Sequence, residues 1–164
     1  MKRLVGILLT LALGGFVWMA HPAKEQVKQM EEQIADQYLY ANYLLRDSVD
    51  KLLAWNFSQP LSDADEGYVN ELSDELLYTS NLMFNRNVVH HEWRERINDI
   101  EHYLNDYIHE TSLSEENIAD LHQALQATRF ISMDLDSEED FYGAMHDDQH
   151  EMVGKVKERL ATQY

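Results

Sequence analysis

The fold is decided by residues 24–57, which read KEQVKQMEEQIADQYLYANYLLRDSVDKLLAWNF. Apolar or aromatic side chains recur here in steps of three and four residues: Val27, Met30, Ile34, Tyr38, Ala41, Leu45, Val49 and Leu52. This spacing averages ~3.67 residues per turn, so the apolar stripe runs nearly straight along one face of a long helix. We expect the helix to end before Pro60, because proline forces the preceding residue out of the helical region.

Similar stripes predict further helices over about residues 63–85, 88–110, 115–133 and 138–160. Ser62, Ser114 and Ser137 each stand where a helix N-cap is expected. No proline or glycine enforces the break at residues 85–87, so the second and third helices could instead form one bent helix. The sequence therefore predicts an all-α chain, in which an N-terminal helix is followed by an antiparallel four- or five-helix bundle.

An apolar run, LVGILLTLALGGFVWMA, occupies residues 4–20. At ~1.5 Å per residue it covers about 25 Å, near the low end for crossing a hydrocarbon core. Lys2 and Arg3 precede it as in a secretory signal, but cleavage after Ala20 would place the large Trp18 where a small residue is required. We expect residues 1–20 to be a retained signal anchor. A signal peptide that is cleaved, so that the protein is secreted, is the alternative.

Lys2 and Arg3 predict a cytoplasmic N-terminus and an extracytoplasmic domain over residues 21–164, because basic residues remain on the cytoplasmic side. The absence of cysteine agrees with an extracytoplasmic protein that needs no disulfide. Gly6, Thr10 and Gly14 would let another helix approach the anchor closely. The sequence leaves open whether the protein forms a homo-oligomer.

The chain is strongly acidic, with 30 aspartates and glutamates against 13 lysines and arginines and a net charge of −17. Every acidic residue lies beyond residue 23. Such a field repels phosphates, and no basic stripe offsets it, so nucleic-acid binding is excluded. The expected binding partners are therefore the membrane, which residues 4–20 would contact, and another protein.

His146 and His150 are four residues apart, so on one continuous helix they would share a face and could bind one zinc or copper ion. Glu151 would supply a carboxylate, and Met145 or Met152 a soft ligand for copper. Because both methionines also fit the apolar stripe of the last helix, packing in the core is the simpler role for them.

Asp134, Asp136 and Glu138 alternate like the opening of a calcium-binding loop. An EF-hand would need glycine at position 139 and glutamate at position 145, where this chain has Glu139 and Met145. The expectation is limited to a weak calcium contact, and an acidic helix start is the alternative.

Tyr40, Tyr43 and Trp55 belong to the first helix but lie off its main stripe. Aromatic side chains in such positions either widen a core or form a surface for a protein partner, since tyrosine and tryptophan are favoured in interfaces. We take these three as the candidate partner surface.

No catalytic motif is present: the chain has no cysteine, no GxSxG and no glycine-rich phosphate loop. We therefore expect a protein that is not an enzyme and that needs no cofactor. Its expected role is interaction or structure at the cell envelope. The alternative is an extracytoplasmic domain that binds zinc, copper or calcium.

Overall fold

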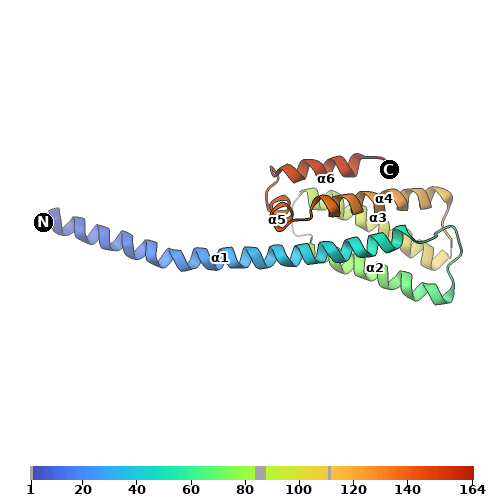
Figure 1. Cartoon of the computed structure of the whole chain (residues 1–164), viewed down its shortest axis with the longest axis horizontal. Coiled ribbons are helices and arrows are strands. Elements are labelled where there is room, and N and C mark those ends of the chain that lie inside the picture. The colour runs from blue at the N-terminus through green and yellow to red at the C-terminus, as the bar shows by residue number, and fades with distance from the viewer. Residues whose placement is uncertain (1, 84–87, 111) are drawn as a thin grey trace. The chain divides into compact units, whose positions relative to one another are not determined.

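The computed structural model describes the backbone of residues 2–83, 88–110 and 112–164, and the side chains of residues 24–83, 91–110, 112–137, 140, 142–144 and 146–164. Every regular element in this part of the chain is a helix, which confirms the all-α prediction (Figure 1). The helices are α1 (Lys2–Leu53), α2 (Asp63–Met83), α3 (Val88–Glu110), α4 (Glu115–Asp134), α5 (Glu138–His146) and α6 (Glu151–Ala161).

The chain divides into two compact units, residues 1–34 and residues 35–164. The described residues of the first unit all belong to α1. The second unit contains the rest of α1 together with α2 to α6. The predicted division into an anchor of residues 1–20 and a domain of residues 21–164 is a different boundary, and it stays a prediction.

Among the residues whose side chains are described, no helix is both long and apolar enough to cross a membrane. The side chains of the apolar run 4–20 lie outside these residues. The prediction of a signal anchor is therefore taken up below as a proposal.

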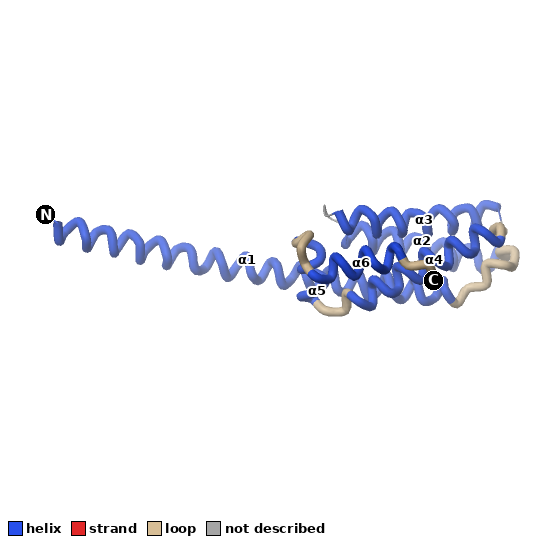
Figure 2. The backbone as a smooth tube through the Cα atoms, turned by 90° about the horizontal axis from the view of Figure 1, so that it is seen from above, coloured by secondary structure: helices blue, strands red, loops and turns tan. Residues whose placement is uncertain are grey.

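Residues 35–164 form an antiparallel helical bundle, in which the axes of α1 to α4 run along a common direction (Figure 2). A hydrogen bond from Ser48 to Glu75 joins α1 to α2, and bonds from Asn42 to the end of α4 join α1 to α4. Helix α3 packs on both α2 and α4 and so closes the ring of four. The fifth and sixth helices are additions to this ring, since α6 packs on α3 and α4 while α5 packs on α6 and α3.

The core is built from the apolar stripes that the sequence predicts. Ala41, Leu45, Val49 and Leu52 of α1 are fully buried, and they meet the buried faces of the other helices. Burying one leucine or valine side chain contributes about 1.5–3 kcal/mol, so these four positions provide a large share of the stability of α1 within the bundle. On α3 the predicted inward residues are also buried: Trp93, Ile97, Ile100, Leu104 and Tyr107.

Two local predictions of helix starts are confirmed. The hydroxyl of Ser62 donates to the carboxylate of Asp65 before α2, and the hydroxyl of Ser114 accepts from the backbone N–H of Asn117 at 3.1 Å to cap α4. Helices α2 and α3 are separate and pack on each other, so the alternative of one bent helix is wrong. The residues that connect them, 84–87, lie outside the described part of the chain.

The end of α1 differs from the prediction. The helix ends at Leu53 and not just before Pro60, because the chain turns there to carry Phe57 into the core. The ring of Phe57 meets those of Tyr107 and His122 edge-on, at centroid distances of 5.3 and 5.9 Å. Burial of this ring therefore terminates the helix before the proline can.

The last predicted helix is also wrong as a single element, because it is divided into α5 and α6. Its start is as expected: Ser137 caps α5 and accepts from the N–H of Asp140 at 3.1 Å. Asp147 then takes an extended backbone conformation, and its carboxylate accepts from the N–H of Gln149 at 2.9 Å. This turn interrupts the helix, and α6 starts afresh at Glu151.

Asn42 is a polar residue that is fully buried beside the core. Its side-chain amide donates to the backbone carbonyls of Ser132 at 2.9 Å and Leu135 at 3.1 Å. In return, the hydroxyl of Ser132 donates to the backbone carbonyl of Asn42 at 3.3 Å. Since the last carbonyls of a helix have no partner within it, the amide serves as a C-terminal cap for α4 supplied by α1.

We predict that Asn42→Ala lowers the free energy of unfolding by about 1–3 kcal/mol, because two buried carbonyls lose their donor. Asn98→Ala, at an exposed position of α3, is the matched control and should change it by less than about 0.5 kcal/mol. Denaturant unfolding followed by circular dichroism measures both. Equal effects of the two substitutions would show that the buried amide contributes nothing.

Candidate functional site

The histidine pair predicted to bind zinc or copper does not share a helix face. His146 ends α5, where its Nδ1 lies 2.9 Å from the backbone carbonyl oxygen of Tyr142 and its ring stacks on the Tyr142 ring at 4.0 Å. His150 lies beyond the turn and caps α6, where its Nδ1 accepts from the N–H of Met152 at 3.4 Å. Both rings therefore have structural roles at helix ends, and the geometric premise of the predicted site is wrong.

Gly143 makes this arrangement sterically feasible. A Cβ at this position would come within 2.5 Å of Cδ2 and Nε2 of the His150 ring. The ring thus lies directly over the backbone of α5, where only a residue without a side chain leaves room for it. Glu151, the third predicted ligand, is exposed in the first turn of α6, where a negative charge favours the helix.

The carboxylates of the predicted calcium turn are held by arginines from other helices. Asp134 accepts two hydrogen bonds from Arg159 of α6, at 2.7 Å from Nε and 3.3 Å from Nη2. Asp136 accepts one from Arg46 of α1 at 3.3 Å. The side chain of Glu138, the third predicted ligand, lies outside the described residues.

The pairing of Arg159 with Asp134 also changes the pKa of the arginine. The hydrogen bonds that Arg159 donates to Asp134 raise the pKa of Arg159 above its already high ordinary value. Among the described side chains, no group of three or more histidines, aspartates and glutamates is arranged to hold a metal ion.

The three aromatic residues of the candidate partner surface are not together. Tyr40 and Tyr43 are exposed, Tyr40 by 64 %. Trp55 is half-buried at the other end of the bundle, where its ring lies 5.7 Å from that of Tyr68 and its Nε1 donates to Tyr107 at 3.4 Å. Trp55 therefore closes the end of the bundle, and the two tyrosines stay available at the surface.

Helix α2 adds residues to this surface that the sequence interpretation missed. Along the seam between α1 and α2, the Trp55–Tyr68 ring contact and the Ser48–Glu75 hydrogen bond fix the antiparallel register. Continuing the seam in steps of three and four residues leads from Glu75 to two exposed residues, Tyr78 and Leu82.

On α1 the same seam leads from Lys51 through Asp47 and Leu44 to Tyr40. At ~1.5 Å per residue, Tyr40 lies about 12 Å from Ser48, and Leu82 about 10.5 Å from Glu75. Because the helices are antiparallel, the step from Ser48 to Tyr40 and the step from Glu75 to Leu82 run in the same direction along the bundle. Along the axis Tyr40 therefore lies about 1.5 Å from the level of Leu82 and about 7.5 Å from the level of Tyr78, and we call these three residues the seam surface.

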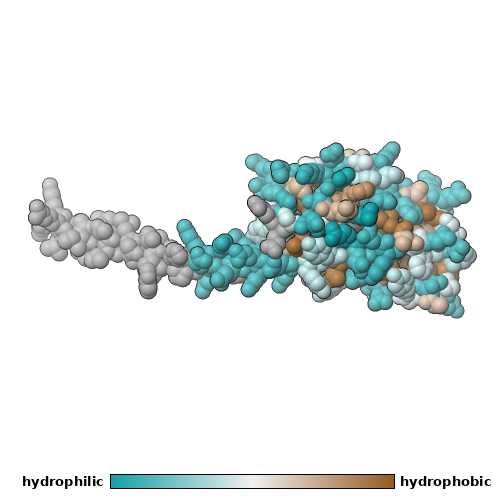
Figure 3. All heavy atoms as spheres, viewed as in Figure 1, coloured by the Kyte–Doolittle hydropathy of each residue, from teal (hydrophilic) through white to brown (hydrophobic). Residues whose placement is uncertain are grey.

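The seam surface is distinct in a largely hydrophilic exterior. On the face drawn in Figure 3, hydrophilic residues prevail and hydrophobic ones are scattered among them. Tyr78 is 63 % exposed and Leu82 is 46 % exposed, although both are large and apolar. The signal in the sequence was their position off the buried line of α2, which comprises Val69, Leu72, Leu76, Thr79, Ser80 and Met83.

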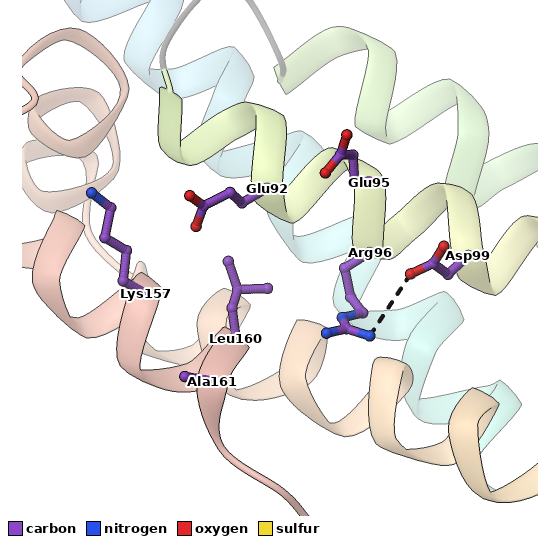
Figure 4. A pocket seen from close by; sticks show the side chains of 7 residues that line it. All are labelled: Glu92, Glu95, Arg96, Asp99, Lys157, Leu160 and Ala161. Atoms are coloured by element: carbon purple, nitrogen blue, oxygen red, sulfur yellow. Dashed lines mark ion pairs between the residues drawn. The ribbon is translucent and has the colours of Figure 1, made fainter.

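A groove of about 340 Å³ lies between α3 and α6 (Figure 4). Glu92 of α3 and Lys157 of α6 reach into it, while Arg96 turns to Asp99 in an ion pair of 3.7 Å. Leu160 contributes the apolar part of its lining. The described lining residues include three carboxylates and two cations, without a serine, threonine or tyrosine to act as a nucleophile.

A second groove, of about 390 Å³, separates α2 from α3. Its polar lining includes the amides of Asn70, Asn98 and Asn105, the hydroxyl of Ser73 and the carboxylates of Asp74 and Glu101. His102, also in its lining, lies 3.6 Å from the carboxylate of Asp106. Such a surface can form hydrogen bonds with a polar ligand. Among its described lining residues the only aromatic ring is the imidazole of His102.

Comparisons of the chain with models of protein families, with curated proteins and with solved structures found no match. The functional argument therefore rests on the geometry of this chain alone.

We predict opposite effects for alanine at two helical glycines. Gly154→Ala, with nothing within 4 Å of the added Cβ, should raise the free energy of unfolding by about 0.5–1 kcal/mol through helix propensity. Gly143→Ala should lower it by about 1 kcal/mol, because the Cβ displaces His150 and removes the cap of α6. Denaturant unfolding measures both, and a stabilised Gly143→Ala variant would contradict the close approach.

Titration calorimetry of the full chain with zinc, copper(II) and calcium should show no stoichiometric binding below about 1 mM. The reasons are the separate positions of His146 and His150 and the engagement of Asp134 and Asp136 by arginines. A one-to-one site that disappears in His146→Ala or in Asp134→Asn would overturn this prediction and favour the cation-binding alternative.

Proposed function

We propose that the protein is a membrane-tethered binding module with an interaction or structural role at the cell envelope. Residues 4–20 act as a retained signal anchor with a cytoplasmic N-terminus, and residues 35–164 form the binding domain on the other side. The domain binds a protein partner through the seam surface of Tyr40, Tyr78 and Leu82. The proposal does not include catalysis.

The observation that carries this proposal is the exposure of three large apolar side chains at the end of one seam. The buried stripes of the bundle are complete without them, since the inward positions of α1 and α2 are filled by other residues. Tyrosine and leucine so placed do not stabilise the domain through burial. Aromatic residues are enriched in protein interfaces, where they supply contact area together with a polar tip.

The charge around the seam surface supports a partner of a particular kind. Glu71 is exposed along the same seam, Asp47 there pairs with Lys51 at 2.7 Å, and the chain has a net charge of −17. Complementary charge speeds association and excludes wrong partners, so the proposed partner carries basic residues around an apolar centre. The apolar run 4–20 supports attachment at the membrane, where such a partner would be presented to the domain.

The test is photo-cross-linking in cells with a benzophenone amino acid in place of Tyr78, and in place of Met133 as the matched control. Met133 is exposed on α4, away from the seam. We expect one discrete adduct from position 78 and none from position 133. Tyr40→Ala should reduce the adduct about tenfold or more, because loss of an aromatic hot spot costs at least ~2 kcal/mol.

Membrane fractionation of the same cells provides the second measurement. The proposal expects the adduct and the uncoupled chain to remain in the membrane after an alkaline wash, with the mass of the full sequence. Equal adducts from positions 78 and 133 would eliminate the seam surface as the binding site. Release of the chain by the wash, or a mass that lacks the first twenty or so residues, would eliminate the anchor.

A further inference from the structure

Val27, Met30 and Ile34 form an apolar stripe on the first unit of the chain. Val27 is 53 % exposed and Met30 is 61 % exposed, while Ile34 is half-buried. The described residues of this unit all belong to α1, so the unit contains no second described element that could cover the stripe. An exposed stripe with this spacing is typical of a helix that pairs with another helix.

The spacing fits a heptad register over residues 24–34 of the first unit. Val27 and Ile34 take the first core position of the heptad, and Met30 takes the second. β-Branched residues at the first position favour a parallel coiled coil of two strands, because their side chains pack well in that geometry. The stripe therefore fits a second helix of the same sequence lying alongside in the same direction.

The charges beside the stripe are compatible with a second copy. The positions that flank a parallel pair hold Lys24, Gln26, Glu31 and Gln33, which together carry no net charge. In register, Gln26 of one copy faces Glu31 of the other, so no like charges meet. Lys28 and Glu32 lie on the outer face, where they pair within one helix at 3.4 Å. This neutral flank contrasts with the net charge of −17 for the chain.

We propose that residues 24–34 of two copies form a parallel two-stranded coiled coil. The inference rests on the proposed anchor, which would hold two copies in one membrane with their N-termini on the same side. A segment of this length is too short to pair stably in free solution, but confinement to a membrane raises the effective concentration of one copy near another. The occupant of the stripe is thus a second copy of this chain.

The absence of cysteine allows a direct test, because one substituted cysteine is then the only thiol in the protein. Val27→Cys and Met30→Cys place that thiol in the proposed core, and Gln29→Cys and Glu32→Cys are matched controls on the outer face of the same helix. The full-length variants are oxidised in native membranes, and the disulfide-linked dimer is quantified by non-reducing electrophoresis. We expect the two core variants to form the dimer at least tenfold faster than the controls.

Ile34→Asp in the Met30→Cys background should reduce the rate to that of the controls, because two buried carboxylates would face each other. Dimers formed at equal rates at all four positions, or at none of them, would overturn the proposal. A disulfide-free adduct of another mass would do the same and would indicate a different protein on the stripe.

The alkaline wash separates this inference from the proposed function. A chain that resists the wash but lacks position-specific dimers removes the coiled coil and leaves the anchor. A chain that is released by the wash removes the anchor, and the pattern of disulfides in the released material then decides the pairing by itself. In the released chain, dimers formed only by the core variants would support the coiled coil. The absence of such dimers would contradict it.

Discussion

The buried amide of Asn42 is the constraint on which the arrangement of the bundle depends. Apolar contacts have no preferred direction, so a stripe such as that of α1 could pack on α4 at several offsets along the axis. An amide with two N–H donors can satisfy two carbonyls, and this one meets those of Ser132 and Leu135 at the end of α4. The stripe provides most of the stability of α1, and Asn42 selects its position.

Once α1 is held at this position, its other polar contacts fall into place. Ser48 meets Glu75 of α2 on one side, and Asp50 meets Arg129 of α4 on the other. The first contact sets the seam that brings Tyr78 and Leu82 beside the level of Tyr40. The exposed surface proposed to bind a partner is therefore a consequence of the register chosen inside the bundle.

Most helices were predictable because their signals are local. The starts at Ser62, Ser114 and Ser137 depend on hydrogen bonds to residues three positions away, and the apolar stripes follow from helical periodicity. The end of α1 and the break after α5 were not predictable. They depend on Phe57 reaching residues far along the chain, and on His150 finding room over Gly143.

The candidate site was predictable only in part, for the same reason. The exposure of Tyr40 could be inferred from its place off the main stripe, but its neighbours on α2 depend on which helices adjoin. The acidic turn was visible as a pattern, whereas the arginines that occupy it come from α1 and α6. A sequence shows which carboxylates are close along the chain and not which cations reach them.

Three arginine–aspartate pairs between helices, Arg46–Asp136, Arg129–Asp50 and Arg159–Asp134, have a consequence for the behaviour of the bundle in salt. They are partly exposed, so added electrolyte weakens each of them modestly. The same electrolyte weakens the mutual repulsion of the many unpaired carboxylates in a chain with a net charge of −17. With 30 acidic residues against 13 lysines and arginines, we expect the second effect to prevail, so that added salt raises the free energy of unfolding.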